Sequence, residues 1–98
     1  MEMHQVRYFL AVAETLNFTR AAEKSNVAQP SLTRAIKLLE EELGGVLFHR
    51  ERSNTHLSEL GHMVLPYLTQ VYEHSNSHFD LEMGFGPVGR PAQSWRGG

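Results

Sequence analysis

The sequence predicts a mainly α-helical chain of three short helices, a β-hairpin and a longer fourth helix. Apolar residues recur at steps of three and four in three separate segments, which is the period of one helix face. Between the third and fourth segments, two short β-prone pieces flank a polar turn, the pattern of a hairpin. The 98 residues, 41% of them hydrophobic, suffice for one small domain with one appended element.

The first predicted helix carries an apolar stripe on one face. The stripe consists of Val6, Phe9, Leu10, Ala13 and Leu16. Asn17 is a favourable residue at which to end this helix, and Thr19 is a natural N-cap for a short second helix. We expect the second helix to end near residues 25–26.

The second and third helices are predicted to approach closely across a tight turn. Small Ala21 and Ala22 permit the approach, and Val27 fills the turn. Pro30 suits the first turn of the third helix, where its missing N–H is not needed. The inward face of that helix is Leu32, Ile36, Leu39 and Leu43, and Gly44-Gly45 ends it.

The hairpin is predicted from residues 46–50 and 55–57, and Ser58 can cap the helix that follows. Glu59 in the first turn of that helix is favoured by the helix dipole. Pro66 either kinks the helix or marks its true start. An apolar seam follows at steps of three and four, with little of the chain left to cover it. Its members are Leu57, Leu60, Val64, Leu68, Val71 and Ser75.

Several classes of protein are disfavoured by what the sequence lacks. It has no cysteine, which excludes a disulfide framework and a thiol nucleophile. It has no apolar run of about 18 residues and no signal peptide, so we expect a cytoplasmic protein. No phosphate loop, zinc signature or catalytic triad is specified, so we expect no enzyme and no cofactor. His74 and His78 could share a helix face, but without a third ligand we interpret them as surface histidines.

The formal net charge of −2 argues at first against a nucleic-acid partner, since small domains that bind nucleic acids are usually basic. The charge is unevenly distributed, however. Residues 20–37 hold four basic residues and one acidic residue, a net +3, and Arg50 and Arg52 outweigh Glu51. The acidic run 40–42 is expected to form a solvated face away from DNA.

The predicted order of elements is that of a winged helix-turn-helix followed by a dimerisation helix. In such a fold, the first turns of the second helix of the pair meet base edges in the major groove. Here that recognition helix begins with Gln29, Ser31, Thr33 and Arg34. Gln can pair with adenine and Arg with guanine. Helical spacing places Pro30, Thr33, Arg34 and Lys37 on a different face from the apolar residues.

A series of motifs runs through the chain in a fixed order. They are VRYFLAVAE over 6–14, FTRAA over 18–22, AQPSLTRAI over 28–36, LLE over 38–40, ELG over 42–44, LFHR over 47–50 and LSELG over 57–61. Through these motifs, residues 1 to about 75 resemble the N-terminal DNA-binding region of the LysR-type transcriptional regulators. Members of that family are typically cytoplasmic bacterial regulators that bind an interrupted dyad of double-stranded DNA as dimers paired into tetramers.

The resemblance implies base or phosphate contacts for the recognition helix and backbone or minor-groove contacts for Arg50 and Arg52 in the wing. Arg50 and Arg52 could instead be merely solvated. Lys37 could contact phosphate or pair with Glu40 or Glu41. The full set of expected DNA-binding residues is Thr19, Arg20, Gln29, Pro30, Ser31, Thr33, Arg34, Lys37, Arg50 and Arg52.

The expected organisation is a winged helix-turn-helix over 1–58, a linker helix over 59–83 that makes a homodimer, and a disordered Gly/Pro-rich tail over 84–98. The dimer contacts are expected at Leu60, Val64, Tyr67, Leu68 and Val71. An interaction module that dimerises without reading DNA is the alternative function.

The chain also departs from the pattern of the family. Ser25 replaces an apolar residue, Gly45 replaces a larger one, and Leu60 stands where a small residue is usual. The effector-binding domain of the family is absent, which predicts a shortened product or a fragment.

Overall fold

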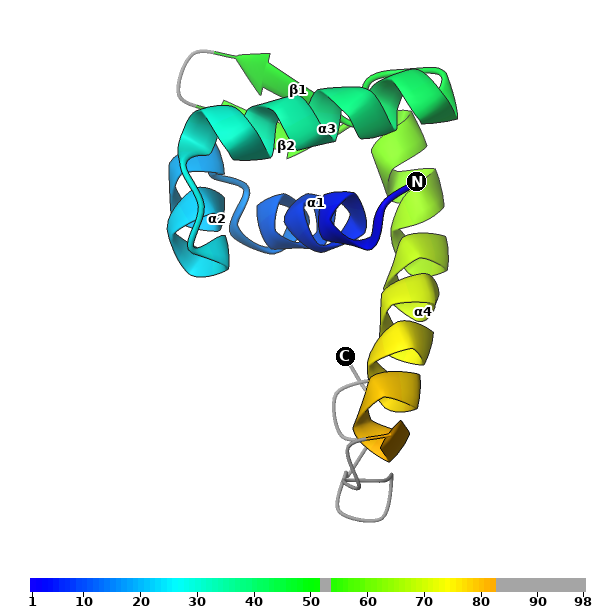
Figure 1. Cartoon of the computed structure of the whole chain (residues 1–98). Helices are drawn as coiled ribbons and strands as arrows, with labels where there is room; N and C mark the ends of the chain where they lie inside the picture. The colour runs from blue at the N-terminus through cyan, green and yellow to red at the C-terminus, as the bar shows by residue number, and fades with distance from the viewer. Residues whose placement is uncertain (52–53, 83–98) are drawn as a thin grey trace.

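The computed structural model describes residues 1–51 and 54–82, with side chains described through residue 74. The described elements are α1 (Met3–Thr15), α2 (Phe18–Ser25), α3 (Gln29–Leu43), β1 (Phe48–Glu51), β2 (Asn54–Leu57) and α4 (Glu59–Glu82). Figure 1 shows α1, α2 and α3 gathered into a head, with the hairpin beside α3 and α4 running past the head to one side. The predicted winged helix-turn-helix with a long last helix is confirmed, while the predicted tail lies outside the described residues.

The junction between α1 and α2 differs from the prediction by two residues. Leu16 adopts the left-handed conformation (φ 53°) as the C-cap of α1, so it is 43% exposed instead of ending the buried stripe. Asn17, not Thr19, is the N-cap of α2, because its side chain accepts a hydrogen bond from the Arg20 N–H at 2.9 Å. Asn17 therefore caps the second helix, which begins at Phe18.

The turn between α2 and α3 is as tight as predicted. Ala21 and Ala22 are buried, and Val27 packs on the core from the turn. Asn26 closes α2 in the left-handed conformation (φ 60°). Gln29 and Pro30 then open α3, which places the polar residues of its first turns at the surface.

The core joins the head to both the hairpin and α4. Phe48 of β1 lies 5.4 Å from Phe9 and 5.7 Å from Phe18, measured between ring centroids. The predicted inward residues of α3 are buried, except that Leu43 is only partly so. The large side chains with the least exposure are Phe9, Leu32, Leu39, Leu47, Leu68, Val6 and Val12.

The acidic run at the end of α3 is not simply a solvated face. The half-buried Glu40 carboxylate accepts a hydrogen bond from the Leu47 N–H at 2.8 Å. Glu42 accepts one from the Met1 amino group at 2.9 Å, and this bond raises the pKa of that amino group. Glu40 thus holds the entry to the hairpin, while Glu41 remains exposed.

The hairpin is antiparallel, with register from Phe48↔Leu57 to Glu51↔Asn54. Ser58 caps α4 as predicted, because its Oγ accepts a hydrogen bond from the Gly61 N–H at 2.9 Å. The same Oγ donates a hydrogen bond to the Val46 carbonyl at 2.6 Å. Helix α4 continues through Pro66, so that proline does not mark its start.

The prediction that the seam of α4 is exposed in a single chain is wrong for most of its members. Leu68 is 0% exposed and belongs to the core, and Leu60 and Val64 pack against the core. These seam residues are covered because α4 packs on the core, with α1 beside it. Leu10 and Ala13 of α1 and Leu65 and Tyr72 of α4 line a hollow of about 370 Å³ between the two helices. Among the α4 residues whose side chains are described, the exposed large hydrophobic ones are Met63 (67%) and Tyr67 (59%).

Candidate nucleic-acid interface

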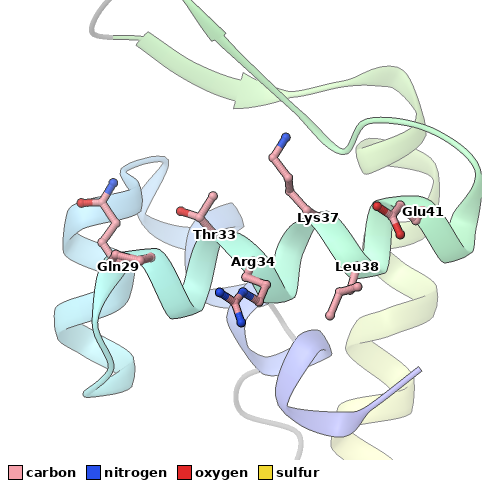
Figure 2. Close-up of a pocket in the computed structure, with 7 residues that line it drawn as sticks. Gln29, Thr33, Arg34, Lys37, Leu38 and Glu41 are labelled. Carbon is pink, nitrogen blue, oxygen red and sulfur yellow. The ribbon is translucent and has the colours of Figure 1, made fainter.

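Polar and basic side chains follow two neighbouring rows along α3. The first row consists of Gln29, Thr33 and Lys37, which are spaced four apart. Figure 2 shows these three side chains on one side of the helix, and the second row, Arg34 and Leu38, on another side. These side chains line an open groove of about 670 Å³ together with Pro30 and Glu41. The helix thus presents donors, acceptors, two cations and the Glu41 carboxylate on one accessible surface. The prediction that the acidic run faces away from this surface is therefore wrong for Glu41.

The predicted residues of α3 fall on this surface with one exception. Arg34, Lys37 and Pro30 are exposed, while Gln29 and Thr33 are half-buried. Ser31 is exposed but does not line the groove, because its position in the helical period places it on a different face of α3.

The hairpin adds a cation next to the first row. Arg50 is exposed, and its guanidinium carbon lies 4.1 Å from the centre of the Phe18 ring. An aromatic face attracts a guanidinium in this position. Arg50 also borders a hollow of about 170 Å³ that Thr33 and Lys37 line from α3. The second predicted wing residue, Arg52, lies outside the described residues.

The start of α2 contacts the start of α3. Thr19 Oγ1 donates a hydrogen bond to Gln29 Oε1 at 3.0 Å. Arg20 is exposed, and its backbone N–H is held by Asn17. Both predicted residues of α2 therefore lie at the surface, and Thr19 contacts the first turn of α3.

The cations of this surface are mostly free of acidic partners. Lys24, which contributes to the local positive charge of the sequence, pairs with Glu14 at 2.6 Å. Within the part of the chain whose side chains are described, no carboxylate forms an ion pair with Arg20, Arg34, Lys37 or Arg50. Glu40 and Glu41 do not pair with Lys37, so the alternative role considered for that lysine is not formed.

Two residues of the surface were not anticipated. Leu38 is 46% exposed within the groove, although its place one helical step of four beyond Arg34 could have revealed it. Phe18 supports Arg50 across 32 positions of sequence, and no local pattern signals such a contact.

A sequence-family model matches most of the chain. Residues 3–62 match the model described as "Bacterial regulatory helix-turn-helix protein, lysR family". The chain belongs to the LysR family. None of the helices in its described ranges is long and apolar enough to cross a membrane.

Relatives of this LysR chain are bacterial transcriptional regulators. The HTH-type transcriptional regulator IlvR of Caulobacter vibrioides is 44% identical over 71 residues, which cover 72% of this chain and 24% of IlvR. CatR of Pseudomonas putida is 58% identical over 52 residues, which cover 53% of this chain and 18% of CatR. The chain therefore spans about a quarter or less of the length of such relatives.

Solved LysR structures share the fold. The CbnR DNA-binding domain in a complex with DNA superposes with a TM-score of 0.78 at 36% identity, covering 86% of this chain and 97% of that one. The BenM DNA-binding domain with catB site 1 DNA gives a TM-score of 0.78 at 36% identity, covering 85% and 92%.

Proposed function

We propose that this chain binds double-stranded DNA sequence-specifically as a homodimer, with α3 in the major groove and the hairpin on the flanking backbone or minor groove. The observation that carries the proposal is the accessible double row along α3, which joins amide and hydroxyl groups to Arg34 and Lys37. Among the side chains that the structure describes, no carboxylate pairs with either cation. The DNA-binding domains of CbnR and BenM, which share this fold at 36% identity, have been solved in complexes with DNA. The cytoplasm is the compartment that this role implies.

The roles divide by position on the surface. The first turns of α3 offer hydrogen-bonding groups of the kinds that read base edges, and Arg34 suits guanine. Side chains at the margin would hold the phosphate backbone, which positions a protein without reading sequence. The proposed base-reading set is Gln29, Pro30, Ser31, Thr33 and Arg34, and the proposed backbone set is Arg20, Lys37, Arg50 and Arg52. Thr19 belongs to the same surface through its hydrogen bond to Gln29.

The proposed homodimer forms through α4. Leu68 is already buried in its own chain, and Leu60 and Val64 pack on the core, so they support the helix from within. Tyr67 and Met63 lie four apart on its exposed side, and the half-buried Val71 lies four beyond Tyr67. Pairing of two such helices would remove this apolar strip from water.

The DNA proposal is tested by comparing two substitutions on the same helix. A duplex selected by the chain from random DNA serves as the specific ligand. Arg34→Ala should weaken specific binding by about 5- to 150-fold, because one bidentate base contact discriminates by about 1–3 kcal/mol. Glu41→Ala, which removes an exposed side chain at the far end of the groove, should change binding less than about twofold.

Fluorescence anisotropy titrations of both variants, at one salt concentration, provide the measurement. An Arg34→Ala protein that binds as well as the unchanged chain would contradict the proposed docking of α3. Equal losses for Arg34→Ala and Glu41→Ala would also contradict it.

A second function is an interaction module that pairs with its own kind without reading DNA. The exposed Met63 and Tyr67 are the observation that favours it. Sedimentation of the chain alone, followed by titration with selected and random duplexes, separates the two functions. A dimer without preference for any duplex would favour the interaction module.

A further inference from the structure

One side-chain hydrogen bond connects the two helices of the helix-turn-helix at the proposed reading surface. The hydroxyl of Thr19, in the first turn of α2, donates to the side-chain carbonyl oxygen of Gln29 at 3.0 Å. Gln29 is the first residue of α3. The bond therefore crosses ten positions of sequence and ends on a side chain that is proposed to read a base.

The bond defines which way the Gln29 amide faces. A carboxamide carries its acceptor oxygen and its NH2 group as two separate branches of one planar carbon atom. Since the oxygen branch bonds to Thr19, the orientation of the NH2 branch is fixed with it. The amide nitrogen of Gln29 thus presents its two N–H donors in a defined direction.

The same bond restricts what Thr19 itself can do. A hydroxyl group has one hydrogen to donate, and here that hydrogen is used on Gln29. While the bond exists, Thr19 has no donor for a phosphate oxygen. Its effect on DNA binding would then pass through Gln29.

We propose that Thr19 is a positioning residue that holds the Gln29 amide ready to donate to an acceptor on a base edge. Such acceptors in the major groove are purine N7, guanine O6 and thymine O4. This inference rests on the proposed DNA binding. Holding a long, flexible side chain in its bound orientation before DNA arrives removes an ordering cost from the binding step.

A purely structural role for the Thr19 hydroxyl has little support in its surroundings. Thr19 is exposed, and the cap of α2 is provided by Asn17. Removal of the hydroxyl therefore leaves the helix cap and the core as they are. This separation makes a clean variant available.

The test uses Thr19→Val, which keeps the branched shape without the hydroxyl, and Thr19→Ser, which keeps the hydroxyl. For each, the full chain is titrated with its selected duplex and with a random duplex, at one salt concentration. The ratio of specific to non-specific affinity should fall about three- to tenfold per half-site in Thr19→Val, the range for one lost hydrogen bond. Thr19→Ser should restore it to within about twofold, and non-specific affinity should stay unchanged in both variants. Because Thr19→Val also loses the bond in the free chain, its melting temperature should fall by about 4–8 °C or less.

The same Thr19→Val change is then made in a Gln29→Ala chain. Because Thr19 acts through Gln29, the second change should add no further loss of specificity. A further loss of the same size would overturn the inference and assign Thr19 a DNA contact of its own. An equal loss on selected and random duplexes would overturn it as well, since that is the behaviour of a phosphate contact.

Failure of the underlying function gives a different result. If the unchanged chain preferred no duplex at all, the proposed DNA reading would fail, and the positioning role with it. If the unchanged chain has a preference that Thr19→Val leaves intact, only the positioning role fails.

Discussion

Asn17 and Thr19 lie two residues apart, and both belong to the residue types that cap helices, yet they do different work. Asn17 accepts the Arg20 N–H, and Thr19 bonds to the side chain of Gln29. The cap at Asn17 satisfies a backbone donor that would otherwise lack an intrahelical partner. Thr19 contributes nothing to that cap.

We predict that Asn17→Ala lowers the free energy of unfolding by about 1 kcal/mol, the usual cost of losing an N-cap. Thr19→Ala, two positions on, should change it by less than about 0.5 kcal/mol, as surface substitutions generally do. Urea unfolding followed by circular dichroism measures both. A larger loss in Thr19→Ala than in Asn17→Ala would contradict this and assign the cap of α2 to Thr19.

Two unusual residues of the sequence turn out to be neighbours. Gly45 and Leu60 were both noted as departures from the pattern of the family. A Cβ atom added at Gly45 would lie 3.0 Å from Leu60 Cδ2, so the glycine leaves the space that the larger leucine uses. Their pairing could not be found from local sequence, because they are fifteen positions apart and the whole hairpin lies between them.

Other residue-level features were predictable because they depend only on neighbours in sequence. Pro30 in the first turn of α3 and Ser58 as the cap of α4 needed no knowledge of the fold. Glu40 was misjudged because its partner, the Leu47 N–H, comes into reach only after the chain turns at Gly44. Charge runs are usually solvated, and only tertiary structure identifies the exception.

At the scale of elements, α4 shows the limit of periodicity. The spacing of its apolar residues correctly predicted a helix with one apolar face, and the structure adds that this face packs on the core, where α4 contacts both α1 and β2. An amphipathic pattern indicates that one face of a helix is buried, but it does not identify the element that packs against that face. The spacing alone did not reveal that α1, which contacts α2 and α3, also contacts α4.

The two sides of α4 should respond differently to truncation. Leu68→Ala opens a cavity in the core and should lower the free energy of unfolding by about 2–5 kcal/mol. Tyr67→Ala removes an exposed side chain and should leave the unfolding of the single chain nearly unchanged. It should instead shift the proposed dimer toward monomer.

Chemical denaturation at low protein concentration and sedimentation equilibrium over a range of concentrations measure the two effects. The proposed dimer through α4 would be contradicted if Tyr67→Ala and the adjacent variant Met63→Ala both left the association constant unchanged.

At the scale of the whole molecule, net charge is a poor guide to the partner. The chain carries −2 overall, but acidic groups are drawn into contacts such as Glu14 with Lys24 and Glu42 with Met1. The cations along α3 and at Arg50 keep their charge toward solvent. A molecule of negative net charge therefore still presents a positive surface where the DNA is proposed to lie.

This distribution predicts a strong dependence of binding on salt. A dimer that neutralises about eight phosphates should give a slope near −7 when log affinity is plotted against log salt concentration. Anisotropy titrations between about 50 and 200 mM salt measure the slope. A flat response would contradict a DNA-binding surface built from these cations.

The burial of Leu68 has a further consequence for geometry along the double helix. Because α4 is fixed to its own head through the core, a pair of such helices would hold two copies of α3 at a set separation and a set rotation. B-DNA repeats its groove every 10–10.5 base pairs. Inserting about five base pairs between half-sites would turn one of them to the opposite face of the duplex. A head that cannot rotate relative to its own α4 would then be unable to contact that half-site.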